Sequence, residues 1–153
     1  MKKYEFTGEV KLILGRTLHR IRATVSFGYV KAGEVGGWIE KEKNLSHDGN
    51  AWVYSNARVY GNARVDGNAR VDGNNRYMTI SSIGSRQDTT TFCYAKGGVI
   101  QVACGCFRGT IEAFAEKVKA THGDNEYAKQ YALAIELAKL TICTDKVEGE
   151  DDA

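Results

Sequence analysis

The stretch from Asn50 to Arg76, NAWVYS NARVYG NARVDG NARVDG NNR, decides the fold of this chain, because it repeats every six residues. Ala and Val lie two positions apart in each unit, so they point to the same side of an extended segment, and the Arg between them points to the other side. A strict period of six predicts a parallel β-helix with the small and β-branched residues inside. The repeated positions are Ala51, Ala57, Ala63 and Ala69, Val53, Val59, Val65 and Val71, and the outward Arg58, Arg64 and Arg70.

The repeat is short for such a fold. Three sides closed by three corners use about 18 residues per coil, so this stretch makes about one and a half coils. Because solenoids need several repeats and covered ends, we expect the flanking segments or a second copy to cover it. Trp38 and Trp52, the two tryptophans of the chain, stand at its entrance. We interpret them as a buried plug, with ligand stacking as the alternative.

Composition places the chain among ordinary water-soluble proteins. It has 153 residues, 42% hydrophobic residues and a mean hydropathy of −0.39, which suits one compact unit or two small ones. No run approaches the roughly 20 apolar residues of a membrane span, and the start, MKKYEFTGEV, lacks the apolar stretch of a signal peptide. Four cysteines fit a reduced, cytoplasmic protein. A net charge of +2 gives no reason to expect a long nucleic acid as partner.

Strand and helix patterns flank the repeat. Alternation predicts strands in residues 1–31, and three β-rich runs from Tyr77 on precede two helical stripes, one capped by Thr110 and one by Asp124 or Asn125. The predicted fold class is mainly β with an α+β C-terminal part: a short left-handed-type parallel β-helix, then a small antiparallel sheet with two C-terminal helices. We expect an N-terminal β cap (1–45), the hexapeptide β-helix (46–76), an α+β ligand-recognition domain (77–142) and an acidic flexible tail (143–153).

The sequence shows no residues organised for catalysis. Hexapeptide β-helices are best known in acyltransferases with a catalytic His, but His19, His47 and His122 have no acid–base partner that the sequence identifies. Alternation puts Cys104 and Cys106 on one strand face, yet a metal site needs further ligands and no second pair follows. We therefore expect no enzyme, no metal and no cofactor.

The arginines of the repeat are the first cationic candidates for binding. In a triangular coil, consecutive units lie on different faces, so Arg58, Arg64, Arg70 and Arg76 spread around the solenoid. Asp66 and Asp72 partly offset their charge. We therefore expect a solvated outer surface, with a phosphate-reading stripe as the alternative.

A second candidate is the turn from a strand into the first helix. Phe107, Arg108, Gly109 and Thr110 run into a helix N-terminus, where free backbone N–H groups, the helix dipole and a guanidinium can hold an anion. Upstream, Arg86 and Thr91 belong to a hydroxyl-rich stretch leading to Phe92, and either phenylalanine can stack a base. The same residues also make an ordinary N-cap and a packed core, so both interpretations stay open.

Two resemblances rest on longer motifs. The first half, with MKKYEFTGE, GRTLHRIRA, KAGEVGGWIE and the GNARV repeats, resembles small phage and prophage proteins of the hexapeptide-repeat, polymer-forming-like β-helix type. The second half, with IGSRQDTTTF, CGCFRGT and THGDN, is similar to the Thoeris anti-defence sponge proteins, which bind cyclic ADP-ribose signals and release them unaltered. This resemblance implies Phe92 as the stacking aromatic and Arg108 with Thr110 at the phosphates, with Arg86 as an extra cation. The β-helix half departs from the compact sponge pattern.

These observations predict a phage anti-defence protein that sequesters a cyclic nucleotide signal of the cyclic ADP-ribose type in the host bacterial cytoplasm, without turnover. The expected partners are that small nucleotide and further copies of the chain, with no membrane. The alternative is an oligomeric scaffold, or an inhibitor of a host protein, acting through the β-helix surface. The expected ligand-binding residues are Arg86, Thr91, Phe92, Phe107, Arg108 and Thr110.

Overall fold

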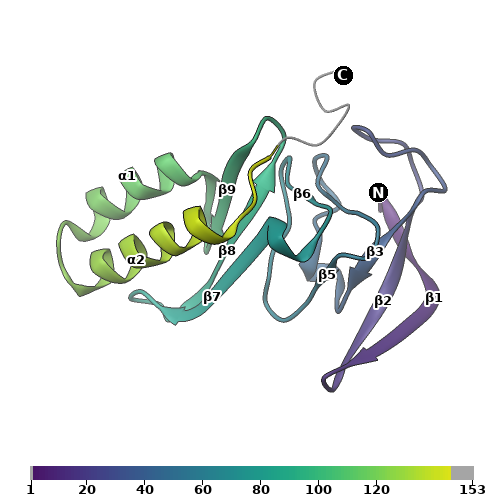
Figure 1. Cartoon of the computed structure of the whole chain (residues 1–153), viewed down its shortest axis with the longest axis horizontal. Coiled ribbons are helices and arrows are strands. Elements are labelled where there is room, and N and C mark those ends of the chain that lie inside the picture. The colour runs from purple at the N-terminus through teal and green to yellow at the C-terminus, as the bar shows by residue number, and fades with distance from the viewer. Residues whose placement is uncertain (1, 146–153) are drawn as a thin grey trace.

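The computed structural model describes residues 2–145, which form three sheets and two α-helices (Figure 1). One four-stranded sheet has the order β1-β2-β3-β5, a second has the order β10-β9-β8-β7, and β4 pairs with β6. The elements are β1 (Tyr4–Ile13), β2 (Arg16–Ala23), β3 (Val35–Ile39), β4 (Trp52–Val53), β5 (Arg58–Val59), β6 (Arg70–Val71), β7 (Tyr77–Ile83), β8 (Asp88–Ala95), β9 (Val99–Cys104), β10 (Phe107–Thr110), α1 (Ile111–His122) and α2 (Glu126–Thr141), with short 3-10 turns at Glu42–Asn44 and Asn74–Arg76.

The repeat buries the residues that its period selects. All eight repeated Ala and Val side chains are at most 3% exposed, and they form one apolar cluster with Tyr4, Ile21 and Ile39 from the first sheet. Trp52 lies fully buried in the same cluster, and Trp38 is 3% exposed. The predicted direction of the Ala and Val side chains is therefore confirmed.

The expected parallel β-helix, however, is wrong. The repeat yields strands of only two residues, because each unit holds few extended residues before the turn at its last residue and the following Asn. Parallel pairing is confined to β3 with β5, β4 with β6 and an isolated bridge from Leu45 to Val65. The longer strands pair antiparallel. Residues 2–145 therefore form mixed sheets with two helices, and no solenoid.

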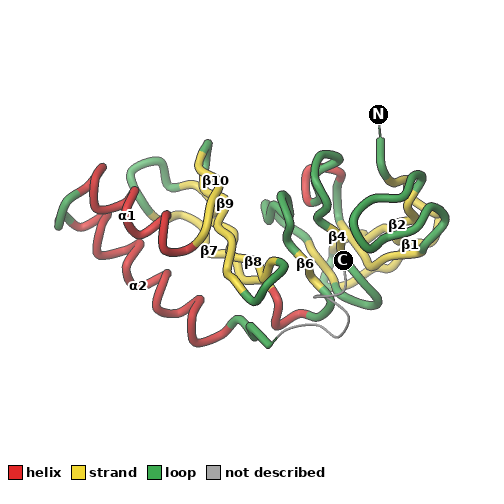
Figure 2. The backbone as a smooth tube through the Cα atoms, turned by 90° about the horizontal axis from the view of Figure 1, so that it is seen from above, coloured by secondary structure: helices red, strands yellow, loops and turns green. Residues whose placement is uncertain are grey.

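The second sheet is covered on both faces. Figures 1 and 2 show the two helices on one side of β7–β10 and the repeat on the other. Along β8, Phe92 and Tyr94 belong to the apolar cluster under the helices, whereas Cys93 between them belongs to the cluster of the repeat. Strand alternation therefore assigns each side chain of this sheet either to the helix side or to the repeat side.

The two helices begin where the sequence predicts. The Thr110 side chain accepts a hydrogen bond from the Ala113 N–H, and the Asn125 side chain accepts one from the Ala128 N–H. Gly123, with φ of 63°, ends α1. Three leucines of α2 lie outside its buried stripe and are 45–85% exposed, namely Leu133, Leu137 and Leu140.

Arg76 joins the repeat to the end of α2. Its guanidinium donates to the Asp72 carboxylate and to the carbonyl oxygens of Cys143 and Asp145, and it lies 4.3 Å from the Tyr94 ring centroid. This arginine is only 9% exposed, so it is not part of a solvated outer surface. The expected acidic tail lies outside the described residues from 146 on. Within residues 2–145, neither helix has the length and apolarity to cross a membrane.

Candidate ligand-binding pocket

The second sheet separates the six residues expected to bind a ligand. Phe92 is fully buried on the helix side, where its ring packs edge-on against Phe114 with centroids 6.2 Å apart. Thr91 is 1% exposed on the repeat side, and its hydroxyl accepts a hydrogen bond from the Arg64 N–H. Neither side chain is open to a ligand. Both residues are part of the packing between layers.

Arg108 and Thr110 face the repeat. The Arg108 guanidinium pairs with the Asp66 carboxylate and donates to the carbonyls of Gly105 and Phe107. Thr110 caps α1, and both residues line a cleft between β10 and the loop after β5. The cation of the predicted anion cradle is therefore already paired with a carboxylate of the chain itself. Local sequence patterns do not predict this pair, because Arg108 and Asp66 are 42 residues apart.

Arg86 and Phe107 meet on the opposite side, at a pocket of about 370 Å³ beside α1. We call it the α1 pocket. Three segments build it: the β7–β8 turn, the β9–β10 turn and the inner face of both helices. Its walls are Ser85, Arg86, Asp88, Cys104, Gly105, Cys106, Phe107, Phe114, Lys117, Val118, Thr121, His122 and Tyr131.

Aromatic rings form much of the wall of the α1 pocket. The rings of Phe107 and Phe114 have centroids 5.3 Å apart, and Phe114 meets Tyr131 edge-on at 5.4 Å. His122 stacks on Tyr131 with centroids 6.0 Å apart and planes 20° apart. Such surfaces offer faces and edges on which a planar ligand can pack. In the sequence, Phe114 and Tyr131 each lie on an apolar helical stripe, and such a stripe does not distinguish a pocket wall from a core.

Two cations stand at the rim of the α1 pocket. Arg86 and Lys117 are exposed, and within residues 2–145 no ion pair engages either of them. The Arg86 guanidinium lies over Gly105, where an added Cβ would be 3.2 Å from Nη1. Asp88 is the one carboxylate in the wall. The rim is therefore suited to an anion.

The position of Tyr131 depends on Gly84. Gly84 has φ of 77°, and a Cβ there would collide with the Tyr131 ring and hydroxyl. The Gly84 N–H also donates to the Gln130 side chain at 2.7 Å. The turn after β7 therefore packs directly against α2. Burial, followed by the nearby Cys104, raises the pKa of Tyr131 to about 12, so its hydroxyl stays protonated at neutral pH.

The cysteines and histidines differ from their predicted settings. Cys104 ends β9 and Cys106 lies in the following turn, so they do not share a strand face. His47 does have an acidic neighbour, since its Nε2 is 3.9 Å from the Glu42 carboxylate. Yet its ring stacks on Tyr4 at 4.0 Å, and burial lowers its pKa. This histidine is a packing element, and the part of the chain that the structure describes holds no cluster suited to a metal ion.

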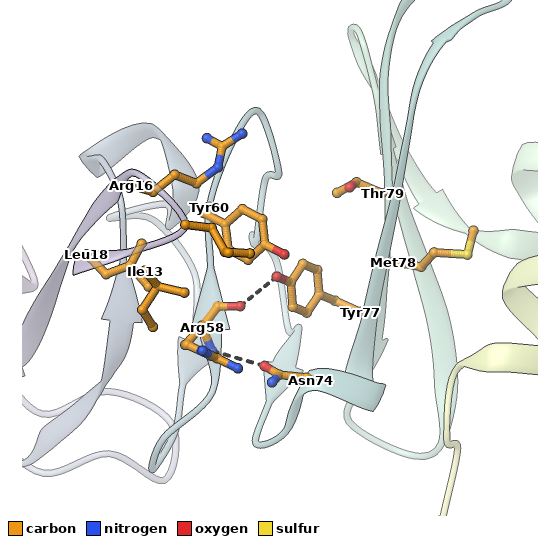
Figure 3. Close-up of a pocket in the computed structure, with 10 residues that line it drawn as sticks. Ile13, Arg16, Leu18, Arg58, Tyr60, Asn74, Tyr77, Met78 and Thr79 are labelled. Atoms are coloured by element: carbon orange, nitrogen blue, oxygen red, sulfur yellow. Dashed lines mark hydrogen bonds between the residues drawn. The ribbon is translucent and has the colours of Figure 1, made fainter. Parts of the chain in front are cut away.

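A second cleft opens between the β1–β2 hairpin and β7 (Figure 3). Its polar atoms are largely engaged: Arg16 pairs with Glu40 at 2.9 Å, and the Tyr77 hydroxyl donates to the Arg58 carbonyl at 2.6 Å. Asn74 accepts from the Arg58 N–H. These bonds join the repeat to β7 and the β1–β2 hairpin to the segment after β3, so we interpret this cleft as part of the packing between elements. The α1 pocket is therefore the better candidate for a ligand site.

Comparisons with known proteins bear on a third of the chain. No protein-family model matches it. A stretch of 51 residues is 41% identical to a protein of Escherichia coli (strain K12) described as the uncharacterized acetyltransferase YdcK. The match covers 33% of this chain and 15% of that protein, so the chain spans a small part of its relative. This similarity is consistent with the hexapeptide-repeat part of the resemblance.

Proposed function

We propose that this chain binds a small anionic ligand with an aromatic ring, of the cyclic nucleotide class, in the α1 pocket and holds it without turnover. The observation that carries the proposal is the combination of aromatic walls from Phe107, Phe114 and Tyr131 with rim cations from Arg86 and Lys117. A base can pack on the rings while a phosphate meets the cations. The pocket volume of about 370 Å³ lies in the range of small-molecule sites.

The identity of the ligand and the role of its sequestration follow, in this proposal, from the resemblance to the sponge family. A protein of that kind sequesters a cyclic ADP-ribose signal in the host cytoplasm and so blunts an anti-phage defence. Two of the residues that the sequence analysis selected, Arg86 and Phe107, line the α1 pocket. Arg108 and Thr110, which the resemblance places at the phosphates, belong in this proposal to the packing between the sheet and the repeat.

The chemistry of the α1 pocket favours holding a ligand over transforming it. The Cys104 thiol accepts a hydrogen bond from the Thr90 hydroxyl at 3.3 Å and lies 3.9 Å from the Tyr131 hydroxyl. Among the described residues, the hydrogen-bond partners of the Cys104 thiol are these two hydroxyls, and neither the His122 imidazole nor the Asp88 carboxylate of the pocket wall is hydrogen-bonded to it. The protonated Tyr131 is a hydrogen-bond donor to a ligand and not a nucleophile.

Titration calorimetry with cyclic ADP-ribose tests the proposal. Arg86→Ala and Lys117→Ala should each weaken binding about 10- to 100-fold, because each removes a charge-assisted contact. Lys119→Ala is the matched control, since it removes an exposed lysine of the same helix outside the pocket. Arg108→Ala should leave affinity unchanged. Binding that depends on Arg108 and ignores Arg86 would place the ligand on the other face of the sheet and overturn the proposal.

A further inference from the structure

The strand β1 is the longer of the two edge strands of the first sheet, whose order is β1-β2-β3-β5. Among the described strands it pairs only with β2 (Figure 1), and seven of its ten residues are exposed. From residue 5 to 13, the described part of the chain offers no second strand to its outer side. A long edge strand presents a row of unpaired N–H and C=O groups to any strand that approaches.

The exposed side chains of this edge are apolar where the hairpin leaves the core. Val10 is 58% exposed, Leu12 is 74% exposed, and Leu14 at the hairpin tip is 97% exposed. Val10 and Leu12 share one face of the strand. Exposing these apolar side chains and unpaired backbone groups to water is unfavourable, so a partner that covers the edge would stabilise it.

The charges beside Val10 identify the covering partner. Glu9 and Lys11 flank it, and neither forms an ion pair within residues 2–145. The Lys11 ammonium instead rests 4.4 Å from the Trp38 ring centroid. In an antiparallel pair centred on Val10, Val10 meets its own counterpart, and Glu9 of each copy lies opposite Lys11 of the other. The edge is therefore complementary to itself.

Gly8 supplies room for this arrangement. In the same register, Leu12 of one copy lies opposite Gly8 of the other, and a Cβ at Gly8 would meet nothing within 4 Å. The β1–β2 register shifts between Phe6 and Val10, where Gly8 has φ of 94°. Regular pairing with β2 therefore resumes at Val10, and Gly8 and Glu9 lie within this irregularity, so a strand added along residues 8–12 follows the bulge at its Gly8 end.

We propose that a second copy of this chain is the partner of the β1 edge, in a two-fold antiparallel dimer centred on Val10. A symmetric interface of this kind repeats every contact twice, so the two charge pairs act together. The inference is independent of the ligand proposed for the α1 pocket, which lies at the other end of the chain's fold.

Sedimentation velocity of the full chain over a concentration series tests the dimer. Wild type should dimerise, and Glu9→Lys or Lys11→Glu should each raise the dimer dissociation constant about tenfold or more, because like charges then face each other. The double exchange Glu9→Lys with Lys11→Glu should restore wild-type dimerisation. Circular dichroism checks that each variant is folded.

Leu133→Asp is the control, since it alters the exposed leucine surface of α2 and should leave the dimer intact. A chain that stays monomeric at every concentration would contradict the proposal. So would a dimer that ignores both single charge changes, or one that Leu133→Asp abolishes.

Discussion

Cys93 lies in the packed interface between the second sheet and the repeat. Its side chain is 2% exposed and lies in the cluster of the repeat, and burial is the main cause that raises the pKa of its thiol above the ordinary 9.0. The folded chain therefore keeps this proton at a pH where the unfolded chain loses it. The stabilising effect of the thiol is fully present below about pH 9 and is lost as the pH rises further.

Cys93→Ala should consequently change how stability depends on pH. The alanine variant loses a constant amount to the smaller side chain. Relative to that variant, wild type should lose about 1.4 kcal/mol for each pH unit above 9. Urea denaturation from pH 7 to pH 10 measures this difference. A difference between the two proteins that stays constant with pH would show that the thiol ionises freely in the fold.

Single residues also mark the limit of sequence-based reasoning about the site. A hydroxyl and an aromatic ring such as Thr91 and Phe92 look available in a sequence, because nothing local shows that both faces of β8 are covered. The same holds for Arg108, whose partner Asp66 comes from the repeat. Arg86 and Phe107 do line the α1 pocket, because the β7–β8 turn and the edge strand β10 are not covered there by another layer. Lys117 could not be distinguished from other surface lysines of α1.

At the scale of elements, the role of Thr110 is to cap the N-terminus of α1. The Thr110 hydroxyl accepts from the Ala113 N–H at 3.2 Å, and its side chain lies outside the α1 pocket. Thr110→Ala should therefore cost about 1 kcal/mol of stability, as the loss of a helix cap does. It should leave the affinity for cyclic ADP-ribose unchanged. Chemical denaturation and calorimetry on the same variant separate the two effects, and a selective loss of affinity would restore Thr110 to the binding site.

The repeat shows which part of an element a sequence can specify. The period of Ala and Val fixes the direction of these side chains, and all of them are buried as predicted. The period does not determine which strand pairs with which. Here the first sheet supplies β3 as a partner for β5, and the antiparallel hairpin of β1 and β2 dominates that sheet. Pairing over a distance depends on the flanking segments, so the expected solenoid did not follow from the repeat alone.

At the scale of the whole molecule, Arg76 and Arg108 join the halves with different strength. Arg76 is ion-paired with Asp72, four residues away, and reaches the other half through the carbonyls of Cys143 and Asp145, whereas Arg108 pairs with Asp66 of the repeat. The Arg76 side chain is 11% exposed, and its partner Asp72 is 26% exposed, whereas the Arg108 side chain is 36% exposed. Removing one member of a buried pair leaves the other uncompensated. Arg76→Ala should cost about 3 kcal/mol, and Arg108→Ala about 1 kcal/mol or less. Guanidinium denaturation measures both, and equal losses would refute the proposed difference between the two joints.

The measurement that tests the central claim most directly is ligand retention followed by release. The purified chain is mixed with cyclic ADP-ribose, desalted, heated and analysed by mass spectrometry. We predict that wild type retains about one ligand per α1 pocket and returns it with its mass unchanged, while the Arg86→Ala and Lys117→Ala double variant retains none. Ligand that washes through wild type, or that returns as a hydrolysed product, would contradict the claim that this protein holds a cyclic nucleotide without turnover.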